Sequence, residues 1–298
     1  MKVLAPQGSD RMVWWNGTPA FSYPYQSSNA NVASLAHTAI DGTFAQDVAG
    51  LTAYAFWRES VYAEFGAYRS AKQGYTNPIT GAAGPLDGTA SNVISGVAPY
   101  WRIAYEQQWQ QHSVEIGAYG AIFKLLPGGG TSTAPATLQG PTNRFSDVAE
   151  DVQYQFLGDN HLFSVAATHI HESQTLDASF ATGASANPRD DLTTSRVTGT
   201  YFYRRKWGGS ASYFSTTGSV DSALYSIGSS PGVTTSANGR PDTTGWIVEA
   251  DYLPWLNVKV SLQYTTYTKF NGGGSDYDGF GRSAKDNNTV YIAAWLAY

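Results

Sequence analysis

Hydrophobic and polar side chains alternate one by one along most of the chain after residue 50. In residues 61–70, for example, Val61, Ala63, Phe65 and Ala67 share one face of an extended chain, and Glu64 lies on the other. A period of two residues predicts β-strands with two chemically different faces. We predict eleven such strands, at residues 51–57, 61–70, 97–109, 113–125, 145–157, 162–172, 193–205, 209–217, 246–253, 258–269 and 288–298.

The links between these strands alternate strictly between tight and long. Tight links fall at 58–59, 110–111, 158–160, 206–208 and 254–256. Long links, such as 71–96, 127–144 and 218–245, are rich in Gly, Ser, Pro and Asn. A transmembrane barrel with short periplasmic turns and long extracellular loops has this asymmetry, whereas a β-sandwich distributes its loop lengths more evenly.

The last predicted strand keeps one apolar face to its final residue, with Val290, Ile292, Ala294, Leu296 and Tyr298 on the same side. Soluble domains rarely end in such a strand, because termini fray in water. The last strand of an outer-membrane barrel faces lipid and pairs with the first. A soluble barrel would show the same period with its faces exchanged, so alternation alone leaves both architectures open.

The positions of the large aromatic residues separate these two architectures. Trp and Tyr prefer the headgroup region of a membrane, because their rings are apolar and their tips polar. A soluble core would place large aromatics nearer to strand centres. Residues beside the tight links, or level with them, therefore predict a membrane girdle: Trp57, Trp109, Phe156, Trp207, Trp255 and Tyr298.

These patterns predict an all-β protein, a transmembrane antiparallel up-and-down β-barrel of about 12 strands or the C-terminal part of a larger one. Residues 51–298 form the barrel, and residues 1–50 form an N-terminal segment of one strand plus a loop. Bacterial single-chain barrels have an even number of strands, and residues 12–25 could supply the twelfth. Pro24 would weaken the end of that strand.

Composition agrees with this architecture. Charged residues make up 14% of the 298 residues, against about 25% in globular proteins, and no apolar run reaches the roughly 18 residues of a membrane helix. The net charge of −5 argues against a nucleic-acid partner. The absence of cysteine excludes disulfides and thiolate metal sites. The N-terminus lacks an apolar signal-peptide core, so we expect a mature, re-engineered or partial chain.

Several stretches resemble a family of Gram-negative outer-membrane β-barrel proteins often labelled "cytochrome c" in genomes. They are 49–57 (AGLTAYAFW), 95–102 (SGVAPYWR), 154–159 (YQFLGD), 171–180 (HESQTLDASF) and the closing region 264–298. Fuller members of that family carry an upstream Cys-x-x-Cys-His haem-attachment segment, which is absent here. The resemblance implies an outer-membrane barrel beside periplasmic electron carriers, without implying that these residues hold haem.

Two short clusters could bind cations. His169 and His171 share a strand face and could chelate a metal, but two ligands leave a site incomplete; a location at the outer membrane interface explains them more simply. Asp190 and Asp191 could bind Ca²⁺, although a solvated acidic loop is the commoner case. We expect no metal and no cofactor in this chain.

Charged residues on the more polar strand faces predict a lining for the barrel interior, because isolated charges in a dry interior are very costly. Their mixed signs fit a wet pore or a salt-bridged plug. They are Glu64, Arg102, Glu106, Glu115, Asp151, Arg196, Arg204, Glu249, Asp251, Lys259 and Lys269.

No catalytic triad or paired-carboxylate signature stands out, so we do not expect an enzyme. Two functions remain open for the barrel. One is a porin-like channel for small solutes or ions. The other is a scaffold or sheath for a c-type cytochrome in electron transfer across the outer membrane, as the resemblance implies. The expected partners are the lipid bilayer, the barrel-assembly machinery acting on the C-terminal strand and, for the second function, a periplasmic cytochrome.

Overall fold

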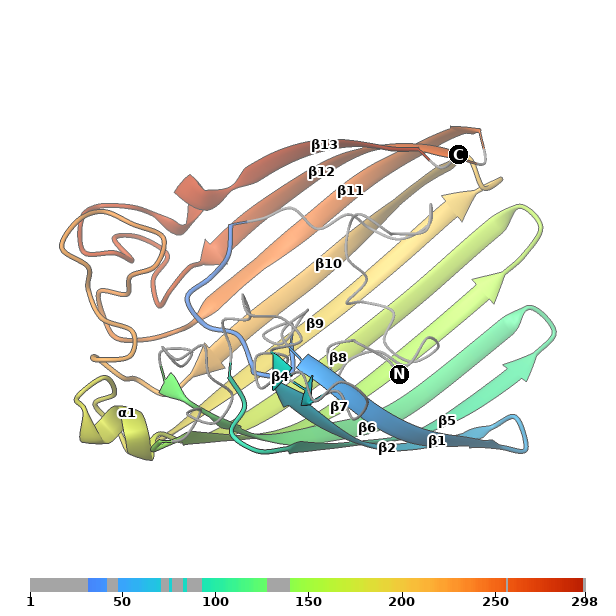
Figure 1. Ribbon diagram of the computed structural model, residues 1–298. Coiled ribbons are helices and arrows are strands. Elements are labelled where there is room, and N and C mark those ends of the chain that lie inside the picture. Colours follow the sequence, from blue (N-terminus) through green and yellow to red (C-terminus); the bar gives the residue numbers. More distant parts are fainter. Residues whose placement is uncertain are drawn as a thin grey trace.

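The fold is one antiparallel β-sheet of eleven strands in the described part of the chain (Figure 1). This computed structural model describes residues 32–41, 48–70, 75–76, 83–84, 93–127, 140–255 and 257–296. Strand neighbours in the sheet are strand neighbours in the chain, which is up-and-down topology. The strands are β1 (Val48–Trp57), β2 (Val61–Ser70), β5 (Ala98–Trp109), β6 (His112–Leu125), β7 (Asn143–Leu157), β8 (His161–Thr175), β9 (Arg189–Tyr203), β10 (Trp207–Gly218), β11 (Thr243–Trp255), β12 (Val258–Lys269) and β13 (Thr289–Leu296).

The remaining described elements are short. A separate hairpin consists of β3 (Tyr75–Thr76) and β4 (Ala83–Gly84). The helix α1 (Asp177–Ala181) follows β8, and a 3-10 helix, Ala284–Asn287, precedes β13. No described helix has the length and apolar character needed to cross a membrane.

The eleven predicted strands and their antiparallel up-and-down order are confirmed. β1 and β13 are the two edges of the sheet, and no pairing joins them within the described residues. Closure into a barrel therefore remains a prediction. The expected twelfth strand at 12–25 lies outside the described residues.

Tight turns gather at one end of the sheet and long connections at the other, as predicted (Figure 1). Two of the predicted links are misplaced. The turn between β9 and β10 occupies 204–206, two residues earlier than expected, and β11 continues through Trp255 with an irregularity after Tyr252. Arg204 and Arg205, within this turn, adopt positive φ angles of 51° and 53°.

Close packing explains why Gly208 lies in β10 and not in the predicted link, and why Gly209 follows it. A Cβ at Gly208 would lie 2.2 Å from the ring of Phe202, and one at Gly209 would lie 2.4 Å from the carbonyl oxygen of Glu249. Any larger residue would push neighbouring strands apart. Glycine is needed here for contact between strands, not for the turn.

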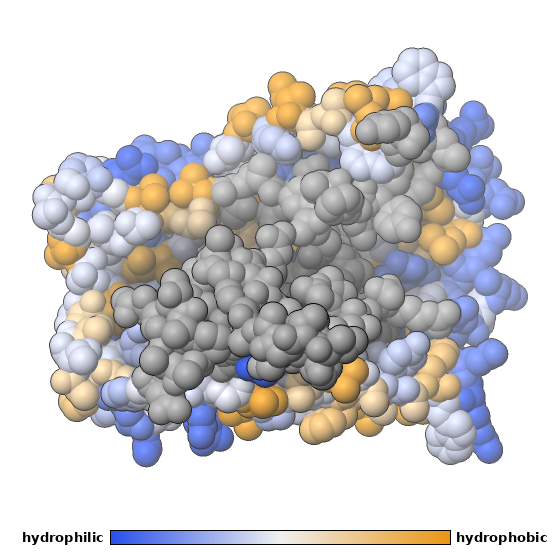
Figure 2. Space-filling view, viewed as in Figure 1, coloured by the Kyte–Doolittle hydropathy of each residue, from blue (hydrophilic) through white to orange (hydrophobic). Residues whose placement is uncertain are grey.

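The outer face of the sheet is exposed and mainly apolar from the tight-turn ends of the strands to about their middle, with Glu150 on β7 as a charged exception. Each strand contributes alternate residues, and Figure 2 shows hydrophobic side chains along the upper and lower edges of the view, with hydrophilic ones at the tight-turn end. We call this surface the apolar belt. Its large exposed residues include Leu51, Phe65, Ile103, Tyr105, Ile116, Val152, Phe163, Val197, Tyr201, Val248, Leu262, Tyr264, Ile292 and Leu296.

The inner face holds the buried side chains. Near the long-loop end they form an apolar cluster in which Ile40, from the N-terminal part of the chain, packs among inward-facing tyrosines, alanines and Phe123. Farther along, the inner face is polar and charged. Most charged residues of the strands thus lie on the more buried face, and the large apolar ones on the exposed face.

Candidate functional site

A three-residue ion cluster lies on the inner face of β5, β6 and β7. The guanidinium of Arg102 is fully buried; it donates to Glu115 Oε1 at 2.9 Å and binds both carboxylate oxygens of Asp151. The ring of Tyr119 lies 5.2 Å from the guanidinium carbon, in cation–π geometry. Strand alternation places the three charges inward, and the registers of β5–β6 and β6–β7 bring them together.

Gly117 makes this cluster possible. It stands directly opposite Asp151 and Ala104 in the sheet. A Cβ at this position would lie 2.6 Å from Asp151 Oδ1 and 2.8 Å from Arg102 Nη2. The missing side chain leaves the space in which cation and carboxylate meet.

A second ion cluster lies across β11 and β12. The ammonium of Lys259 is 3.0 Å from Glu249 Oε1 and 3.1 Å from Asp251 Oδ1, and all three side chains are buried. Gln263 donates to the other oxygen of Glu249 at 2.8 Å. A buried charge is stable only when it has an oppositely charged partner and hydrogen bonds. This cluster supplies both, so its charges can be buried on the inner face.

Residues 32–41 run along the inner face, and we call this segment the strap. Its backbone is held by side chains of the wall: the N–H of Ile40 donates to Asp147 Oδ2 at 2.7 Å, and the N–H of Ala39 donates to Glu172 Oε2. Asp147 and Glu172 are themselves directly opposite each other on β7 and β8. These two buried carboxylates therefore fix one end of the strap.

The strap also contacts β9, β12 and the residues that follow β12. Asp41 lies 3.6 Å from the guanidinium of Arg196 on β9. At the opposite end of the strap, Tyr267 donates its hydroxyl to Val32 O at 2.8 Å, and Asn271 accepts from the backbone of Leu35 at 3.0 Å. The strap thus connects β7–β9 with the long-loop end of β12 and the residues that follow it.

Nearly all charges predicted to line the interior do lie on the inner face, namely Glu64, Arg102, Glu106, Glu115, Asp151, Arg196, Glu249, Asp251 and Lys259. Tyr62 donates to Glu64 at 2.8 Å, and Gln108 donates to Glu106. Carboxylates outnumber cations in this set, so the described inner face is acidic. Whether these residues line an open pore stays a prediction.

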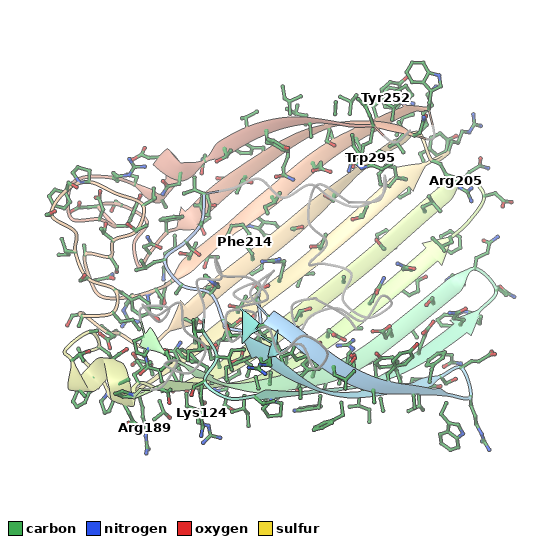
Figure 3. The ribbon with its side chains drawn as sticks, in the orientation of Figure 1. Lys124, Arg189, Arg205, Phe214, Tyr252 and Trp295 are labelled. Atoms are coloured by element: carbon green, nitrogen blue, oxygen red, sulfur yellow. The ribbon has the colours of Figure 1, made fainter. Side chains whose placement is uncertain are left out.

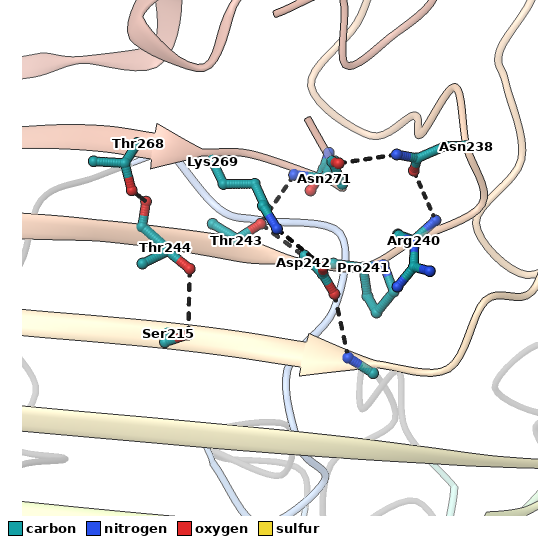
Figure 4. A network of polar contacts seen from close by, with 12 residues as sticks. Ser215, Asn238, Arg240, Pro241, Asp242, Thr243, Thr244, Thr268, Lys269 and Asn271 are labelled. Carbon is teal, nitrogen blue, oxygen red and sulfur yellow. Dashed lines mark hydrogen bonds and ion pairs between the residues drawn. The ribbon is translucent and has the colours of Figure 1, made fainter. Parts of the chain in front are cut away.

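Two predicted positions differ. Arg204 is exposed in the turn after β9, with its guanidinium over the ring of Tyr203, because that strand ends one residue before it; its assignment to the interior was wrong. Lys269 lies at the long-loop end of β12, where it binds Asp242 at 3.3 Å in a network of loop contacts (Figure 4).

Asp147 and Glu172 were missing from the predicted lining. Both follow the inward alternation of their strands, which is the signal that could have identified them. The strap that occupies them could not be anticipated, because Ile40 and Asp147 are 107 positions apart in the chain.

The predicted girdle residues lie on the outer face at the tight-turn ends. Trp57, Trp109, Trp207 and Trp255 are 43% to 69% exposed. Phe156 is half-buried against the ring of His112, with centroids 4.9 Å apart, and Tyr298 lies outside the described residues. Tyr252 stacks on Trp207, with ring centroids 4.2 Å apart, and Figure 3 shows Tyr252 and Arg205 at that end of the sheet.

His169 and His171 are exposed on the outer face and each contacts a hydroxyl of β9, on Ser195 at 2.8 Å and on Thr193 at 3.3 Å. Within the described ranges no group of three or more metal-ligating side chains converges. Asp190 and Asp191 point to opposite faces: Asp190 inward to Asn187, Asp191 outward to Ser173.

The long loops are ordered by carboxylates that accept several hydrogen bonds. Burial alone would raise the pKa of Asp221, but the N–H of Leu224, the hydroxyl of Ser185 and the N–H of Ala186 donate to it and hold its pKa well below the usual range. It therefore stays charged and ties the loop before β9 to the loop after β10.

Comparisons with protein-family models, with curated proteins and with solved structures find no match to this chain.

Proposed function

We propose that this chain is a β-barrel of the bacterial outer membrane whose polar interior conducts small solutes or ions, in the manner of a porin. The observation that carries the proposal is the inverted polarity of the sheet. From the tight-turn ends of the strands to about their middle its exposed face is mainly apolar, whereas ion clusters occupy its covered face.

An apolar surface of this extent is unfavourable in water. Monomeric soluble proteins rarely expose contiguous apolar patches above a few hundred Å², and the belt spans every strand from β1 to β13. In a bilayer the same surface contacts lipid hydrocarbon at little cost. Closure of the sheet gives the backbone N–H and C=O groups of its edge strands their hydrogen-bond partners. Closure of β1 with β13, directly or through a further strand, is therefore part of the proposal.

The aromatic girdle also supports a location in a membrane. Four exposed tryptophans lie at the tight-turn ends of their strands, where an interfacial belt of aromatic residues is expected. The opposite end of the sheet carries the long loops, which would face outward from the cell. The described strands of up to 15 residues exceed the roughly 9–11 residues needed to cross at a tilt.

The acidic inner face points to cations as the preferred solutes. Carboxylates such as Glu64 and Glu106 lower the energy of a cation along a polar path, and rings of Asp and Glu are a common basis for cation selectivity. The strap and the ion clusters narrow that path, so we propose passage of small ions rather than of large solutes.

Planar-bilayer recording of the purified chain tests the proposal. We expect conductance without haem, metal or nucleotide, and a preference for cations. The variant Glu64→Lys should shift the selectivity towards anions, whereas Asp159→Lys, which changes the same charge in an exposed tight turn, should shift it much less. An inserted barrel without conductance would refute the channel, and co-purification of a haem protein with it would favour the electron-transfer scaffold.

A further inference from the structure

Three basic side chains form a row on the outer face of the sheet, at its long-loop end. Lys124 on β6 stands directly opposite Arg144 on β7, Arg144 is opposite Thr175 on β8, and Thr175 is opposite Arg189 on β9. All three basic residues are exposed. Figure 3 shows Lys124 and Arg189 pointing away from the sheet at this end.

These charges are not neutralised by the described protein. No carboxylate among the described residues pairs with Lys124, Arg144 or Arg189. Asp191, on the same face, lies 3.8 Å from His171 instead. Lys124 and Arg144 stand directly opposite each other, and like charges in that position destabilise a sheet, a repulsion that a bound anion would relieve.

The surface beside the row identifies the anion as amphiphilic. Towards the tight turns the same strands present the apolar belt, with Ile116 59%, Val148 53% and Val152 39% exposed. Glu150 interrupts this surface between the two valines of β7. A ligand that uses both surfaces combines an anionic head with hydrocarbon chains. Arginine and lysine bind phosphate by charge-assisted hydrogen bonds, and basic clusters at a membrane surface attract anionic lipid heads.

We propose that Lys124, Arg144 and Arg189 bind the phosphate of a membrane lipid whose acyl chains lie against the apolar belt. This inference rests on the membrane location proposed above. It assigns the long-loop end of β6–β9 as a lipid headgroup site and gives the row a function that its mutual repulsion alone does not explain.

Lipid retention tests this site. The full chain is folded into phosphatidylcholine vesicles that contain a minor fraction of phosphatidic acid, a phosphomonoester lipid. After extraction into non-ionic detergent, the phosphatidic acid retained per protein is measured by mass spectrometry. Replacement of all three residues by Ala should lower the apparent affinity about tenfold to a hundredfold.

The matched control is the triple variant Arg58→Ala, Arg205→Ala and Lys206→Ala, which removes the same charge from exposed tight turns. It should retain the lipid as the unmodified chain does. Equal loss in both variants, or no loss in either, would overturn the site. Displacement of the lipid by inorganic phosphate at low concentration would identify free phosphate as the ligand and overturn the lipid assignment.

Membrane insertion is measured separately, as protection of the strands from protease in the same vesicles. A chain that remains outside the vesicles would overturn the proposed function together with this inference. A protected chain that retains no phosphatidic acid would overturn the headgroup site alone.

Discussion

Substitution of Leu262 by Arg tests whether the outer face of the sheet contacts lipid or water. Leu262 is 52% exposed in the middle of the apolar belt. Its neighbours across the sheet are Ala250 on β11 and Ile292 on β13, and Val260 and Tyr264 flank it on its own strand. None of these side chains can hydrogen-bond a guanidinium at that depth, apart from the hydroxyl tip of Tyr264.

The expected magnitude depends on the medium outside the sheet. In lipid, Arg near the bilayer midplane of a barrel costs about 2–4 kcal/mol, which lowers the folding equilibrium constant about thirtyfold to a thousandfold. In water, an exposed substitution away from special contacts costs within about 0.5 kcal/mol. The two environments therefore predict results that do not overlap.

Urea titration of the chain in phosphatidylcholine vesicles, followed by tryptophan fluorescence, provides the assay. Thr268→Arg is the matched control, because Thr268 is exposed on the same face and strand but lies nearer to the long-loop end. We expect this variant to cost about 0–1 kcal/mol. If Leu262→Arg costs no more than Thr268→Arg, the outer face does not contact hydrocarbon, and the proposed membrane location is refuted.

Three further predictions address the inner face, the loops and the orientation. Arg102→Met should destabilise the folded chain by about 3–5 kcal/mol in the same titration, because Glu115 and its neighbouring carboxylate lose their buried cation; a cost below about 1 kcal/mol would show that the cluster is hydrated. Folding lowers the pKa of Asp221. The ionised carboxylate therefore stabilises the loop fully above the ordinary aspartate pKa of about 3.9, and this stabilisation is lost as the pH falls through the lowered pKa of the folded state. Hydrogen exchange of the loop amides should show this loss, and Asp221→Asn should remove the pH dependence. On intact cells, Ser230→Cys should react with an impermeant thiol reagent and Asp159→Cys should not, and the reverse pattern would refute long loops outside the cell.

Much of the fold was predictable from local pattern. Alternation of side chains in β2 or β12 depends only on successive residues of one strand, so it reveals the strand and its two faces without knowledge of the neighbours. The short and long links then order the strands, because adjacent antiparallel strands joined by tight turns must pair. The inward position of Arg102, Glu115 and Lys259 follows from the same alternation.

Local pattern failed where a glycine is required by close contact with a neighbouring strand. The glycines after Trp207 resemble a turn, yet Gly208 is required by the ring of Phe202 and the turn falls on Arg204 and Arg205, which tolerate positive φ. Glycine has several structural uses that one sequence does not distinguish. β9 also ends two residues before its predicted end, so Arg204 lies in the exposed turn and not on the inner face.

The sequence by itself determined the eleven strands, their order and the different chemistry of their faces, because these are properties of neighbouring residues. The tertiary structure alone decided which charges meet, how the strap crosses the interior and where the basic row stands. Ala39 reaches Glu172 across 133 positions, and Lys124 meets Arg144 only through the register of β6 and β7. Such contacts depend on strand registers and chain crossings, which no local period encodes.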